Sequence, residues 1–422
     1  MSILKAIERI LQVNGSLHDN ESLPEVSKET IERGERNIAF SVENDAVVAL
    51  SLRYCELTSL PDTLGQLSNL HYLNLIGNKL TSLPESFGNL HRLKKLLLDE
   101  NKLTSLPETL GNLHDLEELH VDKNQLSSLP ENIHQLTNLK ILNVYGNNLI
   151  SLPTSLSSLT RLIEVSVGKN QLTSLPEALW LAKNLRFLNV SDNQLSFLSE
   201  QIGNLTHLHT LDVGHNALPA LPESLGMLSN LTFFLYLSNN ALTSLPDSLT
   251  HLNNLRYLNI TDNALTVLPE RIGDLTQLKE LRVYNNALTI LPESLGNLEN
   301  LQELHLMNNQ LGTLPMSIGK LTRLKELHLM NNRLRTLPES LGDLTHLTRL
   351  DLRNNRLTSL PESLSNLTQL TQLDLRGNKF VSIPTSLQDL PHLEKVDMRW
   401  NKIAVFPEWF QRLEQRGCTV FR

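Results

Sequence analysis

A repeat of 23 residues constrains this chain more than any other feature. Between residues 93 and 103, leucine occupies positions 93, 96, 98 and 103, and asparagine occupies position 101. The same pattern starts at residues 70, 93, 116, 139, 162, 185, 208 and 231 and, after one repeat of 24 residues, at residues 255, 278, 301, 324, 347, 370 and 393. A divergent first repeat opens at Val47, which makes sixteen repeats. A period of this length indicates stacked supersecondary units that bury one continuous core.

Each repeat predicts a short strand followed by a wider return segment. The Leu-x-Leu part alternates with a period of two, which is typical of a strand with its leucines inward. Successive strands should stack in parallel about 4.8 Å apart. The return segment contains Pro, which suits the first position of a helical turn, and often Glu, which favours its positive end. We therefore expect an α/β fold. It is a right-handed solenoid, or horseshoe, with a parallel concave sheet and short helical or 3-10 convex turns.

The repeat pattern resembles the leucine-rich repeat family over roughly residues 46–416. Its second half, Leu-Pro-Glu-Ser-Leu-Gly-Asn-Leu, most resembles the 23-residue intracellular repeats of bacterial proteins, plant Ras-group repeat proteins and animal Ras-pathway scaffolds. The asparagine column, meaning the equivalent positions from Asn78 to Asn401, should bond to neighbouring loop backbones. Cys55 takes this position in the first repeat, and the resemblance implies a structural role for it.

The chain should divide into three regions. Residues 1–45 are expected to form an N-terminal helix, a linker and a hairpin strand that caps the stack, with the tight turn at Asn44 and Asp45. Residues 46–407 are the solenoid of sixteen repeats, and residues 408–422 are a C-terminal cap in which Cys418 is structural. The N-terminal helix either caps the solenoid or contacts a partner or a second copy. With both ends covered, we expect the chain to be complete and monomeric.

Composition narrows the class of function. The net charge of −8 argues against general nucleic-acid binding. The sequence has only two cysteines and lacks the cysteine-rich caps of extracellular members of the family, which favours a reducing compartment and a cytoplasmic location. Residues 1–13 are too short and too charged for a signal peptide or a membrane span. No phosphate-binding loop or nucleophile–base arrangement is evident, so we expect no enzymatic activity and no cofactor.

The outward strand positions vary between repeats and can therefore carry specificity. All six tyrosines, including Tyr54 and Tyr72, are expected at such positions. Large aromatic side chains with a polar tip are typical of binding surfaces. The alternative is that they only pack against each other along the sheet. We predict a partner-binding face made of Tyr145, Phe187, Phe233, Phe234, Tyr236, Tyr257, Arg282, Tyr284, His305, Met307, His328 and Met330.

Three smaller features leave alternatives open. The last repeats carry a column of aspartates beside a column of arginines, either a self-neutralising ladder or a secondary polar site for a partner: Asp351, Arg353, Asp374, Arg376, Asp397 and Arg399. Two histidines, at 305 and 328, are too few for a zinc site, so we expect no bound metal. The extra residue of the repeat that starts at Leu231 predicts a β-bulge, which either re-aims a functional side chain or is absorbed in the sheet.

The sequence thus predicts a non-enzymatic scaffold that binds a protein partner, of unknown identity, on its concave face. One alternative is a bacterial effector that acts in a host cell by the same binding mode. The other is an enzyme with an unrecognised site, such as a ubiquitin ligase, in which Cys418 would be the plausible reactive thiol.

Overall fold

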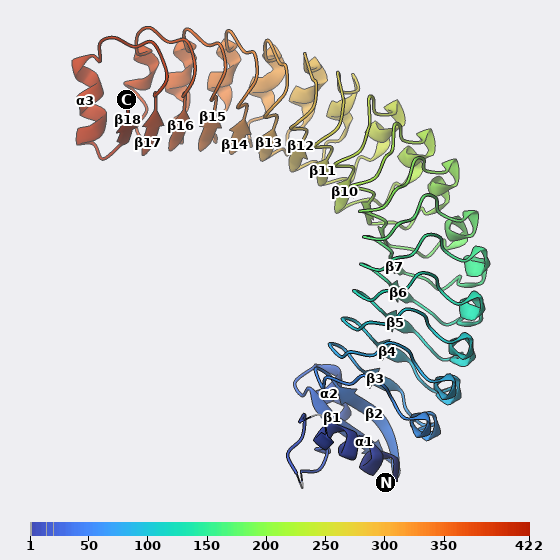
Figure 1. The fold of residues 1–422 in the computed structure, drawn as a ribbon. Helices are drawn as coiled ribbons and strands as arrows, with labels where there is room; N and C mark the ends of the chain where they lie inside the picture. The colour runs from blue at the N-terminus through green and yellow to red at the C-terminus, as the bar shows by residue number, and fades with distance from the viewer. Residues whose placement is uncertain (1, 14, 20) are drawn as a thin grey trace. The chain divides into compact units, whose positions relative to one another are not determined.

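The computed structural model describes residues 2–13, 15–19 and 21–422. Met1 of the expected N-terminal helix and Asn14 and Asn20 of the expected linker lie outside the described residues. The chain forms two compact units, of which the first ends at Leu208 and the second begins at His209. We call them the N-terminal unit and the C-terminal unit. Within each of them, strands line one side of the stack and 3-10 helices line the other (Figure 1).

The N-terminal unit contains a parallel sheet that begins with an antiparallel hairpin. Strands β2 to β8 pair in parallel with a register of one repeat. Strand β1 pairs antiparallel with β2, and the turn residues Asn44 and Asp45 have positive φ, so the predicted hairpin is present. The elements are α1 (Ser2–Val13), α2 (Lys28–Glu32), β1 (Ile38–Glu43), β2 (Ala46–Leu52), β3 (Tyr72–Asn74), β4 (Lys95–Leu97), β5 (Glu118–His120), β6 (Ile141–Asn143), β7 (Glu164–Ser166) and β8 (Phe187–Asn189).

The C-terminal unit continues the same construction. Its strands pair in parallel from β9 to β18. The expected final helix is α3, and Gly417, with a φ of 92°, follows it. The elements are β9 (Thr210–Asp212), β10 (Phe234–Tyr236), β11 (Tyr257–Asn259), β12 (Glu280–Arg282), β13 (Glu303–His305), β14 (Glu326–His328), β15 (Arg349–Asp351), β16 (Gln372–Asp374), β17 (Lys395–Asp397), α3 (Glu408–Gln415) and β18 (Thr419–Phe421).

Short 3-10 helices form the return segments, as predicted. Proline, however, precedes the first helical position and acts as the N-cap with extended backbone angles. Ser199 replaces it in one repeat and accepts a hydrogen bond from the N–H of Gln201. The 3-10 helices span Asp62–Gln66, Glu85–Asn89, Glu108–Asn112, Glu131–Gln135, Thr154–Ser158, Glu177–Leu181, Glu200–Asn204, Glu223–Met227, Asp247–His251, Ile272–Asp274, Glu293–Asn297, Met316–Lys320, Glu339–Asp343, Glu362–Asn366 and Thr385–Leu387.

The asparagine column joins each repeat to the one before it, as the sequence predicted. Asn101 accepts a hydrogen bond from the backbone N–H of Leu80 at 3.1 Å and donates to the carbonyls of Leu75 and Leu98, both at 2.9 Å. The arrangement recurs at Asn78, Asn124, Asn147, Asn170, Asn193, Asn240, Asn263, Asn286, Asn309, Asn332, Asn355, Asn378 and Asn401. Buried backbone groups of the loops are therefore satisfied by a side chain that also fixes the spacing of repeats.

The residue before each column asparagine has a positive φ, which turns the chain out of the strand. Asn, Asp and Gly are frequent there because they tolerate this conformation. Tyr54 occupies the same position, with a φ of 54°. The prediction that Tyr54 lies at an outward strand position is therefore wrong: it lies in the turn that follows β2, with its ring against Gly77.

The extra residue of the ninth repeat lies before the strand and not within it. Strand β10 pairs with β9 and β11 in unbroken register. The additional residue is accommodated at Thr232 and Phe233, where the chain bends just ahead of the strand. The predicted β-bulge is therefore absent from the paired residues of β10. The extra residue fits ahead of the strand because the residues there are not part of the strand pairing. The insertion leaves the Phe233 side chain 49 % exposed.

Candidate functional site

Alternation along the strands sorts the outward side chains of the C-terminal unit into three columns. The first column contains Thr210, Phe234, Tyr257, Glu280, Glu303, Glu326, Arg349, Gln372 and Lys395. The second contains Asp212, Tyr236, Asn259, Arg282, His305, His328, Asp351, Asp374 and Asp397. The third column lies two residues after the second column in each repeat and contains Tyr284, Met307, Met330, Arg353, Arg376 and Arg399. Together these columns form the sheet face.

Four aromatic side chains meet at β10 and β11, and we call them the aromatic cluster: Phe233, which lies just before β10, and Phe234, Tyr236 and Tyr257. The Phe234 ring stacks on Tyr236 with centroids 5.6 Å apart and meets Tyr257 edge-on at 5.3 Å. Tyr236 and Tyr257 are 5.2 Å apart. Burial raises the pKa of Tyr257 to about 12, yet Phe234 remains 40 % exposed. The structure therefore brings these predicted binding residues together in a preformed patch that is still open to solvent.

Arginines border the aromatic cluster. The guanidinium of Arg282 lies 5.6 Å from the ring centroid of Tyr257 and forms an ion pair with Glu280. Arg256, which the sequence analysis did not single out, lies 6.0 Å from the ring of Phe233. Such cation–π contacts hold an aromatic face in place. Tyr284 is half-buried in the third column, outside the ring contacts that define the cluster.

The remaining aromatic predictions fall in the N-terminal unit. Phe187 begins β8, and the Tyr145 ring packs against the position of Gly168. Tyr72 is at an outward position of β3 but is only 3 % exposed, because Ile31 of α2 and Ala39 of β1 pack in the same cluster. An outward strand position was therefore not enough to predict exposure, since the segment before the repeats covers this part of the sheet.

Two histidines stack on neighbouring strands. The rings of His305 and His328 are nearly parallel, with an angle of 6° and centroids 4.7 Å apart. Their Nε2 atoms lie 3.1 Å from Glu303 and 2.9 Å from Glu326, respectively. Burial lowers the pKa of His305. The histidines alone suggested no metal site, but Glu-Leu-His recurs at the interval of one repeat, and alternation places Glu and His on one face.

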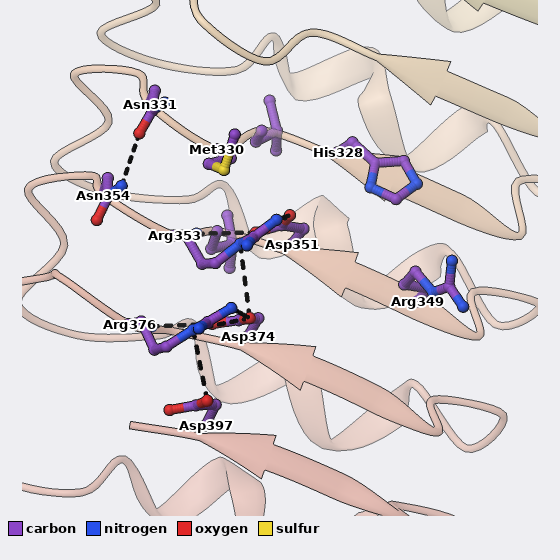
Figure 2. Close-up of polar contacts among 12 residues, drawn as sticks. His328, Met330, Asn331, Arg349, Asp351, Arg353, Asn354, Asp374, Arg376 and Asp397 are labelled. Atoms are coloured by element: carbon purple, nitrogen blue, oxygen red, sulfur yellow. Dashed lines mark hydrogen bonds and ion pairs between the residues drawn. The ribbon is translucent and has the colours of Figure 1, made fainter. Parts of the chain in front are cut away.

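The aspartate and arginine columns interlock (Figure 2). Each arginine binds the aspartate that ends the strand of its own repeat: Arg353 with Asp351 at 2.5 Å and Arg376 with Asp374 at 2.6 Å. Arg399 binds Asp397 in the same way, at 2.7 Å. Arg353 also lies 3.5 Å from Asp374, and Arg376 lies 3.4 Å from Asp397. Three positive and three negative charges thus form a continuous ladder, the self-neutralising arrangement that was one of the two interpretations.

The ladder adjoins a hollow of about 250 Å³ on the sheet face. Arg349, Gln372 and Lys395 of the first column line it opposite the three aspartates. At the other side of the ladder Trp400 is 71 % exposed, and the guanidinium groups of Arg376 and Arg399 each lie 5.7 Å from its ring. Sequence analysis did not predict Trp400 as a binding residue, because it occupies the turn position and not a strand position.

The two thiols are buried. Burial raises the pKa of Cys55 to about 12 and also raises that of Cys418. A raised pKa lowers the fraction of thiolate, the reactive form.

Among the described residues, none of the helices is long and apolar enough to cross a membrane.

Comparison with known sequences assigns the repeats. The family described as a leucine-rich repeat region matches residues 49–126, 234–314 and 312–415, and a family of paired leucine-rich repeats matches residues 183–225. The chain belongs to the leucine-rich repeat family. A search of curated proteins finds no match.

Solved structures of leucine-rich repeat proteins share this fold. A leucine-rich repeat protein of Leptospira interrogans is 33 % identical, with a TM-score of 0.74 over 88 % of this chain and 95 % of that one. Toll of Drosophila, in the Toll–Spatzle complex, is 27 % identical with a TM-score of 0.71, over 82 % of this chain and 49 % of that one. The Arabidopsis receptor kinase HAESA, solved with a peptide hormone and a co-receptor, is 26 % identical with a TM-score of 0.59, over 90 % and 75 %.

Proposed function

We propose that this leucine-rich repeat protein is a non-enzymatic scaffold that binds a polypeptide partner on its sheet face, with the aromatic cluster as the main anchor. The observation that carries the proposal is the open packing of the cluster. Four aromatic side chains contact each other at β10, β11 and the residue before β10, while Phe233 and Phe234 keep 49 % and 40 % of their surface exposed. A solvent-exposed group of this kind usually marks a contact surface.

The physical advantage of the cluster is its low ordering cost. Side chains already held by neighbouring rings lose little freedom when a partner covers them, so more of the burial energy appears as affinity. Ring pairs of this geometry contribute about 0.5–1.5 kcal/mol beyond area burial. Arg282 and Arg256 border the rings and can bind carboxylates or carbonyls of a partner that covers the patch.

The half-buried side chains further along the face extend the proposed surface. They are Tyr284, His305, Met307, His328 and Met330. The Asp–Arg ladder with Trp400 is proposed as a secondary polar site. Among similar structures, the Toll–Spatzle complex and HAESA with its peptide hormone and co-receptor support a polypeptide ligand class. The cysteine usage supports a reducing, cytoplasmic location.

The proposal is tested by affinity capture with three baits: the intact protein, a Phe234→Ala/Tyr236→Ala/Tyr257→Ala variant, and a control variant. The control is Met227→Ala/Ile290→Ala/Met316→Ala, which removes apolar side chains that are 60 %, 57 % and 62 % exposed but lie off the sheet face. Circular dichroism confirms that each bait is folded. Captured proteins are identified by mass spectrometry, and the affinity of the purified partner is measured by calorimetry.

The expected result is one partner bound equally by the intact protein and the control, and at least about tenfold more weakly by the cluster variant, as for the loss of interface hot spots. A partner that binds the cluster variant with unchanged affinity would place binding elsewhere and reject the proposal.

A further inference from the structure

Two Glu-Leu-His triplets lie side by side on the sheet face. Strand β13 consists of Glu303, Leu304 and His305, and strand β14 of Glu326, Leu327 and His328. The strands pair in register, so Glu opposes Glu and His opposes His. Because side chains alternate along a strand, all four polar side chains point to the same side. Glu280 of β12 completes the first column next to Glu303.

The donor atoms around His305 have the spacing of a metal site. Its Nε2 lies 3.1 Å from Oε2 of Glu303 and 3.8 Å from Oε1 of Glu280. One ligand atom from each of these residues lies within 4.8 Å of the others. A tetrahedral zinc ion with bonds of about 2.0–2.1 Å holds its ligand atoms roughly 3.4 Å apart. The two observed Nε2–oxygen distances bracket that separation, so the side chains need only small rotations to surround an ion.

His328, on the next strand, lies outside this group of three residues and borders it. Its ring lies parallel to that of His305 at 4.7 Å, and its Nε2 also faces the first column, where it contacts Glu326. The same Oε2 atom of Glu326 also lies 3.3 Å from Arg349, so His328 and Glu326 already have partners of their own. Both histidine side chains are well shielded, with 13 % and 14 % exposed.

We propose that Glu280, Glu303 and His305 bind one divalent transition-metal ion, with Zn²⁺ as the best match and one coordination position left open, as at zinc sites with three protein ligands. An imidazole nitrogen with two carboxylate oxygens suits Zn²⁺, Co²⁺ or Ni²⁺, whereas Mg²⁺ and Ca²⁺ prefer sites made of oxygen ligands. The site goes beyond the partner-binding proposal and does not depend on it, because its ligands lie outside the aromatic cluster that carries that proposal, although His305 is also part of the proposed surface.

Arg282 limits the affinity of this site. It forms an ion pair with the same Oε1 atom of Glu280 that faces His305. A bound cation must share or displace this contact and also meets the repulsion of the guanidinium. Arg282→Met removes both effects while keeping an apolar side chain against the Tyr257 ring, so it should bind zinc more tightly than the natural chain.

The test is calorimetric titration of the full chain, stripped with a chelator, with zinc chloride and in parallel with magnesium chloride. We expect one zinc ion per chain and no heat from magnesium. His305→Ala and Glu303→Gln should weaken zinc binding at least about tenfold, since loss of even an outer-shell partner costs that much at metal sites. Cobalt binding should give the visible absorption of a tetrahedral ion.

The N-terminal unit contains a matched control. Strand β5 is also Glu-Leu-His, with His120 near Glu118 at 3.3 Å, but Glu118 is ion-paired to Lys95 and the facing residues on β4 and β6 are Leu97 and Asn143. His120→Ala should therefore leave zinc binding unchanged. The proposal is overturned by the absence of zinc binding at concentrations up to about 1 mM, the weak limit of specific affinity. The proposal is also overturned if His305→Ala leaves zinc binding unchanged. The same holds if His120→Ala weakens zinc binding as much as His305→Ala does.

Discussion

The backbone N–H of Tyr145 donates a hydrogen bond of 2.7 Å to the carboxylate of Asp122 in the preceding repeat. The Asp122 carboxylate is largely buried, and the backbone N–H of Asp122 donates to the carboxylate of Asp99 at 2.7 Å. Burial, together with the charge of Asp99, raises the pKa of Asp122 to about 6. The hydrogen bond therefore joins two repeats through a carboxyl group whose charged form is destabilised by its surroundings.

This relationship predicts a pH-dependent gain in stability for Asp122→Asn. A pKa raised in the folded state favours the folded protein below the ordinary aspartate pKa of 3.8, and that contribution is lost as the pH rises through 6. Asparagine keeps the acceptor for Tyr145 without the charge. We expect about 1–2 kcal/mol of added stability at pH 7.5, after allowing for solvent screening, and none near pH 3.5. Thermal unfolding at both pH values measures this, and an equal gain at both would contradict it.

The inward and outward assignment predicts different effects for two adjacent residues of β11. Leu258 is fully buried, so Leu258→Asp places an unpaired charge in the core and should unfold the repeats around it. Tyr257→Phe removes only a hydroxyl on the sheet face and should change the free energy of unfolding by less than about 0.5 kcal/mol. Denaturant unfolding followed by circular dichroism compares the two variants, and similar losses in both would show that the assignment is wrong.

The 3-10 side of the stack predicts a steric limit. A Cβ added to Gly296 would lie 2.4 Å from the backbone oxygen of Ser317 in the next repeat. Gly296→Ala should therefore force neighbouring repeats apart and lower stability by about 1–3 kcal/mol, as overpacking does. Gly312→Ala is the matched control, because nothing lies within 4 Å of its Cβ position. A melting temperature lowered equally by both variants would count against this steric explanation.

The asparagine column predicts a large loss from a single amide. Asn309 accepts from the N–H of Leu288 at 3.0 Å and donates to the carbonyls of Val283 and Leu306 at 2.9 and 3.1 Å. Asn309→Ala leaves these buried backbone groups without a hydrogen-bond partner, which should lower the free energy of unfolding by about 1–3 kcal/mol for each unpaired group. Its neighbour Asn308 is exposed and has a positive φ, so Asn308→Gly should be nearly neutral. Amide hydrogen exchange at residues 283–288 provides the measurement, and unchanged protection in Asn309→Ala would refute the role.

The repeated features could be predicted from sequence because each recurs in fifteen or sixteen repeats. The strand positions, the 3-10 returns and the bonding of the asparagine column all follow from local chemistry and the period. Contacts that depend on non-repeated segments could not be predicted in this way. Tyr72 has the sequence context of an exposed residue, but α2 and β1 cover it. The hairpin itself was predictable from its turn.

The sequence predicted which residues belong to the candidate site, but not which of them contact each other in the aromatic cluster and around the histidines. Alternation indicates which side chains face outward but not which rings touch, because ring contacts depend on rotamers and on the exact path of the chain before β10. Phe233 joins the aromatic cluster only because the extra residue lies ahead of the strand. The pairing of Glu303 with His305 was accessible from sequence, since both belong to the same alternating strand.

The direction of the asparagine bonds also sets an order for folding during synthesis. Asn101 satisfies Leu75 and Leu80, which precede it by 26 and 21 residues. The loop of any repeat therefore stays incomplete while the ribosome translates the following one. The growing chain always carries one unfinished repeat at its emerging end, and each asparagine that leaves the exit tunnel closes the loop behind it.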